Sequence, residues 1–270
     1  MIEFLIILFS TVLLLCLLYL FVFVRPRKSG SEVEKFLVSY AHRGLHGGKI
    51  PENSLLAFKN AVDKGFGIEL DVQLSKDGVV MVFHDYSLLR MTGCDKKLSE
   101  LDYSELSKLS LSGTDEKIPT LNEVFSLVDG SVPLLVELKG EDLNDAVCGK
   151  TAELLKDYKG HYCIESFNPF LLRKMRRYLP CAFYGQLYTN VCRDKNKISI
   201  LNILLSLMAF NFLAKPNFIA YNKSDRDSLP VKLTTKLYKA YKFVWTLKSE
   251  DEYNVAQKLG ESPIFERDVK

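Results

Sequence analysis

The sequence lacks the concentrated charge of a nucleic-acid-binding protein. Its 270 residues carry a net charge of +3, far from the basic stripe that binding to a phosphate backbone requires. We therefore expect no DNA or RNA partner. Internal repeats and low-complexity tracts are also absent. The content of 47% apolar and 26% charged residues excludes a disordered chain and indicates one globular domain that can bury a full core.

Paired cysteines are missing as well. The six cysteines lie far apart, none of them in a C-x-x-C pair, and Cys16 stands inside an apolar run. This spacing indicates neither a zinc site nor a disulfide framework. Reduced thiols agree with a cytoplasmic location. No feature of the sequence predicts a protein partner.

The N-terminal region has no charge over residues 4–24, a stretch dominated by Leu, Ile, Val and Phe. At about 1.5 Å per residue, a helix of this length crosses a hydrocarbon core of about 30 Å. A secretory signal peptide has basic residues before a shorter apolar run, whereas here Glu3 precedes the run and Arg25, Arg27 and Lys28 follow it. We therefore expect residues 1–28 to be an uncleaved, single-span anchor in the lipid bilayer. The positive-inside rule then predicts that residues 29–270 face the cytoplasm.

After a polar linker, residues 29–35, short apolar runs alternate with helical patterns over residues 36–270. The strand candidates are residues 36–41, 66–74, 79–83, 134–138, 162–166, 181–187, 218–221, 243–247 and 263–266, and the helix candidates include residues 54–64, 121–128, 143–158 and 170–178. Such alternation implies parallel strands joined by right-handed crossovers. Nine candidates fit an α/β fold of the TIM-type (β/α)8 barrel, with one strand absent or in a hairpin. The pattern alone leaves an open doubly wound sheet as the alternative.

Two segments interrupt this alternation. Residues 92–120 are mostly polar, and we interpret them as an insertion at the active-site end. Residues 198–214 are apolar apart from Asn202, Ser206 and Asn211, which fits a buried barrel helix, an interfacial helix or a second span. Because the length is marginal for a span, we favour a helix that packs on the barrel or lies at the membrane surface.

Polar residues gather where the predicted strands end. Glu69 and Asp71 stand two apart on one strand, so their side chains project from the same face between apolar neighbours. Buried carboxylates repel each other and are tolerated mainly with a cation between them; the alternative is a solvent-facing stripe on an edge strand. Oxygen ligands without cysteine favour one divalent cation such as Mg²⁺, Ca²⁺ or Mn²⁺ over zinc.

Other polar groups follow neighbouring strands. His42 follows the first strand candidate, His84 follows the third, and Glu137 and Lys139 end the fourth. In a parallel α/β barrel the loops after the strands converge on one rim, where active sites lie. We therefore expect these groups to meet there, while His46 and His161 are interpreted as ordinary core or surface residues.

Eight short motifs, taken together, resemble the glycerophosphodiester phosphodiesterase family in order and spacing over about residues 38–247. They are His42-Arg43-Gly44, Pro51-Glu52-Asn53-Ser54, Glu69-x-Asp71, Ser75-Lys76-Asp77-Gly78, His84-Asp85, Glu137-x-Lys139, Ser166-Phe167 and Trp245-Thr246. The resemblance implies a phospholipase-C-like TIM barrel with one divalent cation. It also implies hydrolysis of glycerophosphodiesters to sn-glycerol 3-phosphate and an alcohol.

The resemblance also assigns roles to residues. It makes His42 and His84 the acid/base pair, in either order, and three carboxylates the metal ligands: Glu69, Asp71 and Glu137. Substrate contacts are assigned to Arg43 and Lys139 at the phosphate and to Phe167 and Trp245 as an aromatic wall. Glu52 and Asn53 become supporting residues behind these. The chain departs from the family at residues 262–268, which replace an apolar strand and a Thr-Asp-x-Pro-like turn, so barrel closure by the last strand is left open.

Several alternatives stay open at this point. The nucleophile is either water or the glycerol 2-hydroxyl, which would give a cyclic phosphate first. Instead of a glycerophosphodiesterase, the chain could be a lysophospholipase D that acts on lysolipids at the membrane, a catalytically silent membrane scaffold, or a phosphoinositide- or sphingomyelin-cleaving relative. The presence of both histidines and all three carboxylates disfavours the scaffold, and the pair formed by Glu137 and Lys139 disfavours the last alternative.

Overall fold

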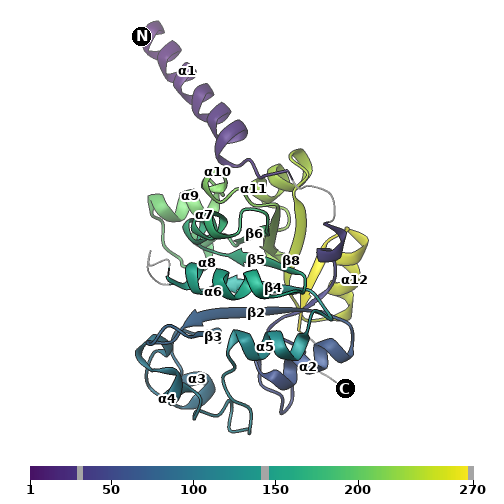
Figure 1. Ribbon diagram of the computed structural model, residues 1–270. Coiled ribbons are helices and arrows are strands. Elements are labelled where there is room, and N and C mark those ends of the chain that lie inside the picture. Colours follow the sequence, from purple (N-terminus) through teal and green to yellow (C-terminus); the bar gives the residue numbers. More distant parts are fainter. Residues whose placement is uncertain (29–32, 141–145, 267–270) are drawn as a thin grey trace.

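A closed barrel of eight parallel strands forms the centre of the computed structural model, which describes residues 1–28, 33–140 and 146–266 (Figure 1). The strand order is β1-β9-β8-β7-β6-β5-β4-β2, and β1 pairs with both β2 and β9, which closes the sheet. The strands are β1 (Tyr40–Ala41), β2 (Gly67–Leu74), β4 (Leu134–Leu138), β5 (Tyr162–Ser166), β6 (Phe183–Tyr188), β7 (Phe218–Asn222), β8 (Tyr241–Leu247) and β9 (Ser262–Phe265). The predicted TIM-type barrel is therefore confirmed, and the open sheet is excluded.

The candidate at residues 79–83 belongs to a hairpin and not to the barrel. Strand β3 (Val80–Val82) pairs antiparallel with β2, forms a further bridge from Met81 to Thr120, and stands outside the barrel. Gly78, with a φ of +82°, makes the turn between them. The last strand candidate, left open by the sequence, does close the barrel: β9 lies between β1 and β8.

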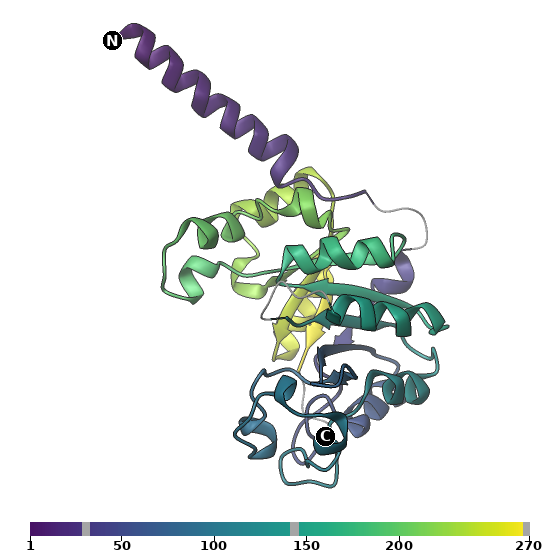
Figure 2. The same cartoon turned by 60° about the vertical axis from the view of Figure 1, so that its left-hand side comes forward.

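Helices cover the outside of the barrel (Figure 2). The longer ones are α2 (Leu55–Asp63), α5 (Leu121–Val128), α6 (Ala146–Asp157), α7 (Pro169–Tyr178) and α12 (Glu250–Lys258). Polar caps fix where they begin: the side chain of Ser54 accepts a hydrogen bond from the amide of Ala57, and Thr120 accepts one from the amide of Glu123. Four of these helices, α2, α5, α6 and α7, match the sequence candidates, although the first residues of candidate 143–158 lie outside the described residues.

The first strand is shorter than the candidate 36–41. Residues Glu34–Phe36 form a single 3-10 turn, η2, and only Tyr40 and Ala41 join the sheet. The hydroxyl of Tyr40 donates a hydrogen bond to the carbonyl of Phe36, and the ring of Phe36 stacks on Phe183 at 5.2 Å. The apolar residues before Tyr40 therefore cover the end of the barrel instead of extending the strand.

The interior of the barrel changes from apolar to acidic along its axis. Near the amino ends of the strands, Phe218 stacks on Phe183 and Phe243 with ring centroids 5.0 and 4.2 Å apart. Gly185 makes room for this stack, since a Cβ there would lie 2.0 Å from the Phe218 ring. Because side chains alternate along a strand, the residue two positions after buried Leu135 on β4 also faces inward, and it is Glu137. The polar site thus lies at the carboxyl ends.

Residues 92–120 stand apart from the barrel, beyond the carboxyl end of β2 (Figure 1). They contain η3 (Leu98–Glu100) and α4 (Tyr103–Leu106), and α3 (Leu89–Thr92) leads into them. Leucines of this segment, among them Leu98, Leu101 and Leu106, pack with Met81 and Phe83 into a small core of their own. This core holds the loop after β3 against the rim of the barrel.

The N-terminal helix projects away from the barrel (Figure 1). Helix α1 (Ile2–Leu18) continues into a π-helical turn, η1 (Tyr19–Phe23), and the 22 residues from Ile2 to Phe23 have the length and composition of a membrane span. It is the only such helix among the described residues. Residues 198–214 instead divide into two short helices, α9 (Ile200–Ser206) and α10 (Asn211–Ala214), which are too short for a second span.

Shorter elements complete the connections around β6 to β8. They are α8 (Val191–Asp194), η4 (Lys223–Asp225), α11 (Leu229–Lys232) and η5 (Leu233–Leu237). Buried Asp225 holds α8 in place, because its carboxylate accepts hydrogen bonds from the Arg193 guanidinium and the Asn190 amide.

Candidate active site

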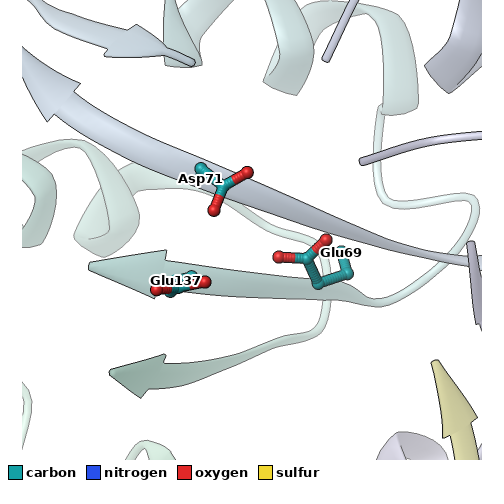
Figure 3. Close-up of side chains that lie close together, drawn as sticks. All are labelled: Glu69, Asp71 and Glu137. Carbon is teal, nitrogen blue, oxygen red and sulfur yellow. The ribbon is translucent and has the colours of Figure 1, made fainter. Parts of the chain in front are cut away.

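Three buried carboxylates converge at the carboxyl ends of two neighbouring strands (Figure 3). Glu69 and Asp71 lie on β2, and Glu137 lies on β4 directly opposite Asp71 in the strand register. One carboxylate oxygen of each lies within 4.8 Å of the others. Oxygens bound to one cation at about 2.0–2.6 Å have separations in this range, so the geometry suits a divalent cation.

Asp71 has an oxygen atom that the protein leaves without a hydrogen bond. Its Oδ2 accepts one from the Asn53 amide at 2.9 Å, but buried Oδ1 accepts none and has only the Lys139 ammonium at 3.1 Å. Burial opposes ionisation of Asp71, yet the positive charges around it, Lys139 foremost, together lower its pKa. An ionised, buried carboxylate whose inner oxygen has a lysine as its ion-pair partner can also serve as a ligand for a cation.

In the other two carboxylates the pKa is raised, which favours the protonated form. Burial, followed by repulsion from Asp71 and Glu137, raises the pKa of Glu69 well above its ordinary value. Burial also raises the pKa of Glu137 to about 7, although Lys139 lies 2.7 Å away and opposes the shift. The cluster is therefore short of positive charge, which is the chemistry expected of an acidic metal site.

His42 is oriented by the carboxylate of Glu266, the residue directly after the last strand. Its Nδ1 lies 2.7 Å from Glu266 Oε1, while Nε2 faces Glu69 Oε2 at 3.9 Å. The hydrogen bond from His42 lowers the pKa of Glu266 to about 2, so Nδ1 donates to an ionised acceptor. Burial lowers the pKa of His42 itself. A neutral imidazole in this tautomer presents the lone pair of Nε2 to the site.

His84 has the same kind of support from a different direction. Its Nδ1 lies 2.7 Å from Asp85 Oδ1, and Arg90 donates to the other oxygen of Asp85 at 2.5 Å. Burial lowers the pKa of His84. The side-chain amide of Gln73 donates to the carbonyls of Phe83, His84 and Asp85, which fixes the backbone that carries this histidine.

Arg43 occupies a constrained position between the two histidines' loops. Its φ is +55°, a left-handed conformation that is rare outside glycine, and in it the backbone amide donates to Glu69 Oε2 at 2.8 Å. Its guanidinium donates to Glu52 at 2.9 Å. The next residue, Gly44, packs against α2 where a Cβ would lie 2.9 Å from Ala57. The His-Arg-Gly motif is therefore required by backbone geometry as well as by side-chain chemistry.

The converging groups surround a pocket of about 100 Å³. Its polar side is formed by the histidines, Arg43, Lys139 and the acidic cluster, and its apolar side by Phe167, Leu187 and Trp245. The rings of Phe167 and Trp245 meet edge to face at 5.6 Å, and the Trp245 indole N–H donates to the carbonyl of Ala220. The pocket combines cationic groups with an aromatic wall, as an organophosphate requires.

The structure brings together every site residue that the sequence predicted, with Asp71, Glu52 and Asn53 lying just behind the pocket wall. Sequence reasoning did not single out Glu165, a buried carboxylate of β5 that lines the pocket opposite Glu137. It also missed Gln73 and Glu266, which orient the histidine loops. A signal for Glu165 did exist, since it stands at the end of an apolar strand beside the Ser166-Phe167 motif.

Comparison with known proteins agrees with this chemistry. Residues 42–268 match the glycerophosphoryl diester phosphodiesterase family. The chain belongs to this family. It is a phosphoric diester hydrolase with glycerophosphodiester phosphodiesterase activity.

Family members of known sequence or structure cover most of the chain. A glycerophosphodiester phosphodiesterase from Caldanaerobacter subterraneus subsp. tengcongensis is 31% identical over 84% of this chain and 93% of its own length. A rat protein named lysophospholipase D is 29% identical over 86% of this chain and 84% of its own. An Oleispira antarctica phosphodiesterase, solved with the product sn-glycerol-3-phosphate, superposes with a TM-score of 0.70 and 25% identity over 85% of this chain and 92% of its own.

Proposed function

We propose that this family member hydrolyses glycerophosphodiesters with one divalent cation held by Glu69, Asp71 and Glu137 and with His42 and His84 as the acid/base pair. The observation that carries the proposal is the meeting of two carboxylate-oriented histidines with an acidic cluster in one pocket. Mg²⁺, Ca²⁺ and Mn²⁺ are the candidate ions, because the ligands are all oxygens.

Arg43 and Lys139 bind the phosphodiester. Both are cations that line the pocket, and nearby carboxylates raise the pKa of each although burial opposes this. Both therefore stay charged at neutral pH and offset the negative charge that repels a nucleophile. When bound, the cation adds Lewis-acid stabilisation of charge on the phosphoryl oxygens. Phe167 and Trp245 hold the carbon skeleton against the apolar wall.

The two histidines move the protons. One accepts at Nε2 the proton of the attacking oxygen, which belongs to water or to the glycerol 2-hydroxyl. The other, protonated when the diester binds, donates to the departing alkoxide, which is too basic to leave alone at neutral pH. Glu266 and Asp85 hold the rings in position and stabilise the imidazolium form.

An assay of the full-length chain in detergent micelles tests this proposal. The protein is stripped with a chelator, given glycerophosphocholine, glycerophosphoethanolamine or glycerophosphoglycerol, and assayed for glycerol 3-phosphate with each ion. Activity that returns with a metal and disappears in His42→Gln and His84→Gln supports the roles. The matched control is His161→Gln, an exposed histidine at the opposite end of the barrel. Turnover by the chelated protein, or by either site variant, would refute them.

The proposal also states where in the cell the enzyme lies. Helix α1 with η1 anchors the chain in a bilayer, and Arg25, Arg27 and Lys28 keep the barrel on the cytoplasmic side. Protease treatment of sealed spheroplasts or cells, compared with lysed ones, tests the side. Digestion of the barrel in sealed cells would show that the barrel lies outside the cell. Release of a shortened chain into the medium would show that the N-terminal helix is a cleaved signal peptide.

A further inference from the structure

A second, larger cavity adjoins the catalytic pocket. It has a volume of about 340 Å³ and shares Phe167 and Leu187 with the 100 Å³ pocket. Eight of its thirteen lining residues are apolar or aromatic, including Leu205, Met208 and Phe210 from the segment around α9 and α10. An apolar cavity of about 150 Å³ holds one benzene molecule, so this cavity has room for a stretch of hydrocarbon chain, which the catalytic pocket has not.

The segment that covers this cavity exposes large apolar side chains. Ile198 and Ile200 are 82% and 80% exposed, and Leu201, Ile203 and Leu207 are also exposed. A contiguous apolar surface of this kind marks a partner or a membrane. The covering helix, α9, thus has Leu205 toward the cavity and other apolar side chains exposed on its surface.

The same segment is joined to the end of the membrane-span helix. The Tyr19 hydroxyl donates to the carbonyl of Leu207 at 3.0 Å, and the Asn211 side-chain amide donates to the carbonyl of Val24 at 3.0 Å. The rings of Phe23 and Phe212 lie 5.5 Å apart. Figures 1 and 2 both show α9 and α10 on the side of the barrel from which α1 emerges. The exposed side of α9 is therefore continuous with the surface that enters the bilayer.

The lysines next to this exposed apolar surface favour contact with the bilayer. Lys195 and Lys197 are exposed and directly precede Ile198 and Ile200. Apolar side chains next to lysines are the composition of an element that lies in the headgroup layer, where the lysines meet anionic lipid and the apolar groups enter by about 5–10 Å.

Resting on the hydrolysis proposed above, we propose that α9 lies in the surface of the bilayer that holds α1 and that the cavity beneath it takes the acyl chain of a lysophospholipid. The acyl chain is esterified to the glycerol whose phosphodiester occupies the catalytic pocket. Water supplies the oxygen that bonds to phosphorus, the bond from phosphorus to the head-group oxygen breaks, and the head-group alcohol leaves with a proton. The products are lysophosphatidic acid and the free alcohol.

A series of substrates that differ only in chain length tests the cavity. The full-length chain in vesicles is given glycerophosphocholine and its 1-hexanoyl, 1-octanoyl and 1-decanoyl esters. The value of kcat/KM should rise with length, by up to roughly fourfold for each methylene that enters an apolar site. Leu205→Trp, which fills the cavity, should remove at least nine-tenths of this gain and leave turnover of glycerophosphocholine unchanged. Leu154→Trp, the same change in a half-buried residue elsewhere on the barrel, should keep the gain.

A spectroscopic measurement tests the position of α9 without relying on activity. Ile200→Trp and Val255→Trp each place an indole at an exposed apolar site, on α9 and on α12 respectively. In vesicles with brominated acyl chains, the fluorescence of Ile200→Trp should be quenched beyond the wild-type level, and that of Val255→Trp should not. Equal quenching of the two variants would show that α9 does not lie in the bilayer.

The outcomes separate the two proposals. Turnover of glycerophosphocholine without any dependence on chain length, or with a dependence that Leu205→Trp leaves intact, overturns the acyl cavity while the catalytic proposal stands. Loss of turnover with every substrate overturns the catalytic proposal itself. Chain-length dependence that Leu205→Trp removes, together with quenching at Ile200→Trp alone, supports the lysophospholipid inference.

Discussion

Metal binding to this protein should compete with protons, because two of the three proposed ligands are held in a state that favours the carboxylic acid. Burial raises the pKa of Glu137 to about 7 and raises that of Glu69 well above its ordinary value. A cation binds the ionised form, so each proton has to leave first. The experiment compares Mn²⁺ titrations at pH 8 and at pH 6.

The magnitude follows from Glu137 alone. At pH 8 a group with a pKa near 7 is mostly ionised, and at pH 6 about nine molecules in ten carry the proton. Apparent affinity should therefore fall about tenfold, which is about 1.4 kcal/mol, and the raised pKa of Glu69 makes the fall larger. A carboxyl group with an ordinary pKa near 4.3 would change affinity hardly at all over this range.

The assay is isothermal titration of the chelator-treated chain in micelles at pH 6, 7 and 8, repeated in buffers of different ionisation enthalpy to count released protons. Glu137→Gln should weaken binding and flatten the pH dependence, whereas Glu153→Gln, an exposed residue of α6, should leave both unchanged. The same dissociation constant at pH 6 and 8, with no proton release, would refute this electrostatic account of the cluster.

The same pKa shifts predict how the metal changes stability. A carboxyl group whose pKa is raised by folding contributes stability below its unfolded pKa and loses it as pH rises through the folded value. For Glu137 that loss is complete above pH 7. The rise in Tm on adding metal should therefore be larger at pH 8 than at pH 5.5, and scanning calorimetry of the two samples measures it. A smaller rise at pH 8 would contradict the sign of the shift.

Three further substitutions probe the histidines and the barrel. His84→Gln should lower kcat by about 10²–10⁴, the usual range for a general acid or base, with metal affinity retained; a loss below tenfold would exclude the role. Glu266→Gln removes a partner that raises the pKa of His42, so the acid limb of the kcat/KM profile should move to lower pH, and an unchanged limb would show that Glu266 does not act through His42. Gly185→Ala places a Cβ 2.0 Å from the Phe218 ring, which should cost about 1–3 kcal/mol and lower Tm by about 2–4 °C per kcal/mol; an unchanged Tm would mean that the ring stack yields freely.

The polar residues on long strands were predictable because their physics is local. Glu69 and Asp71 share a strand face by simple alternation, and β2 is long enough for the apolar pattern around them to be read. The family resemblance then placed Glu137, Arg43 and Lys139 beside them. The barrel followed from the regular alternation of strands and helices.

The supporting residues were not predictable in this way because their contacts depend on barrel closure. Glu266 meets His42 across 224 positions of sequence, and only the pairing of β9 with β1 brings them together. Glu165 faces the site because of the register between β4 and β5. The shortened β1 likewise reflects the burial of Tyr40 in the barrel, which local propensity does not report.

Residues 198–214 show a different reason why sequence alone could not predict the structure. Core helices, interfacial helices and spans share an apolar composition, so the pattern favoured a helix against the barrel or at the membrane without deciding between them. The structure shows two short helices: α10 packs against α7, and the Tyr188 hydroxyl of β6 donates to the carbonyl of Ser206 at the end of α9, with isoleucines left exposed. Contact with lipid remains a proposal for the quenching experiment.

The row of alternating charges behind the pocket has a consequence for how substitutions within it combine. Asp85, Arg90, Glu52, Arg43 and Asp71 follow one another with contacts of 2.5, 2.6, 2.9 and 3.6 Å. Loss of the middle carboxylate, Glu52, would leave the guanidinium groups of Arg90 and Arg43 without the anion that lies between them. Each charge in the row has its partner on either side, so a change at one position should disturb the groups at the next, and the effects of two changes in the row should not add.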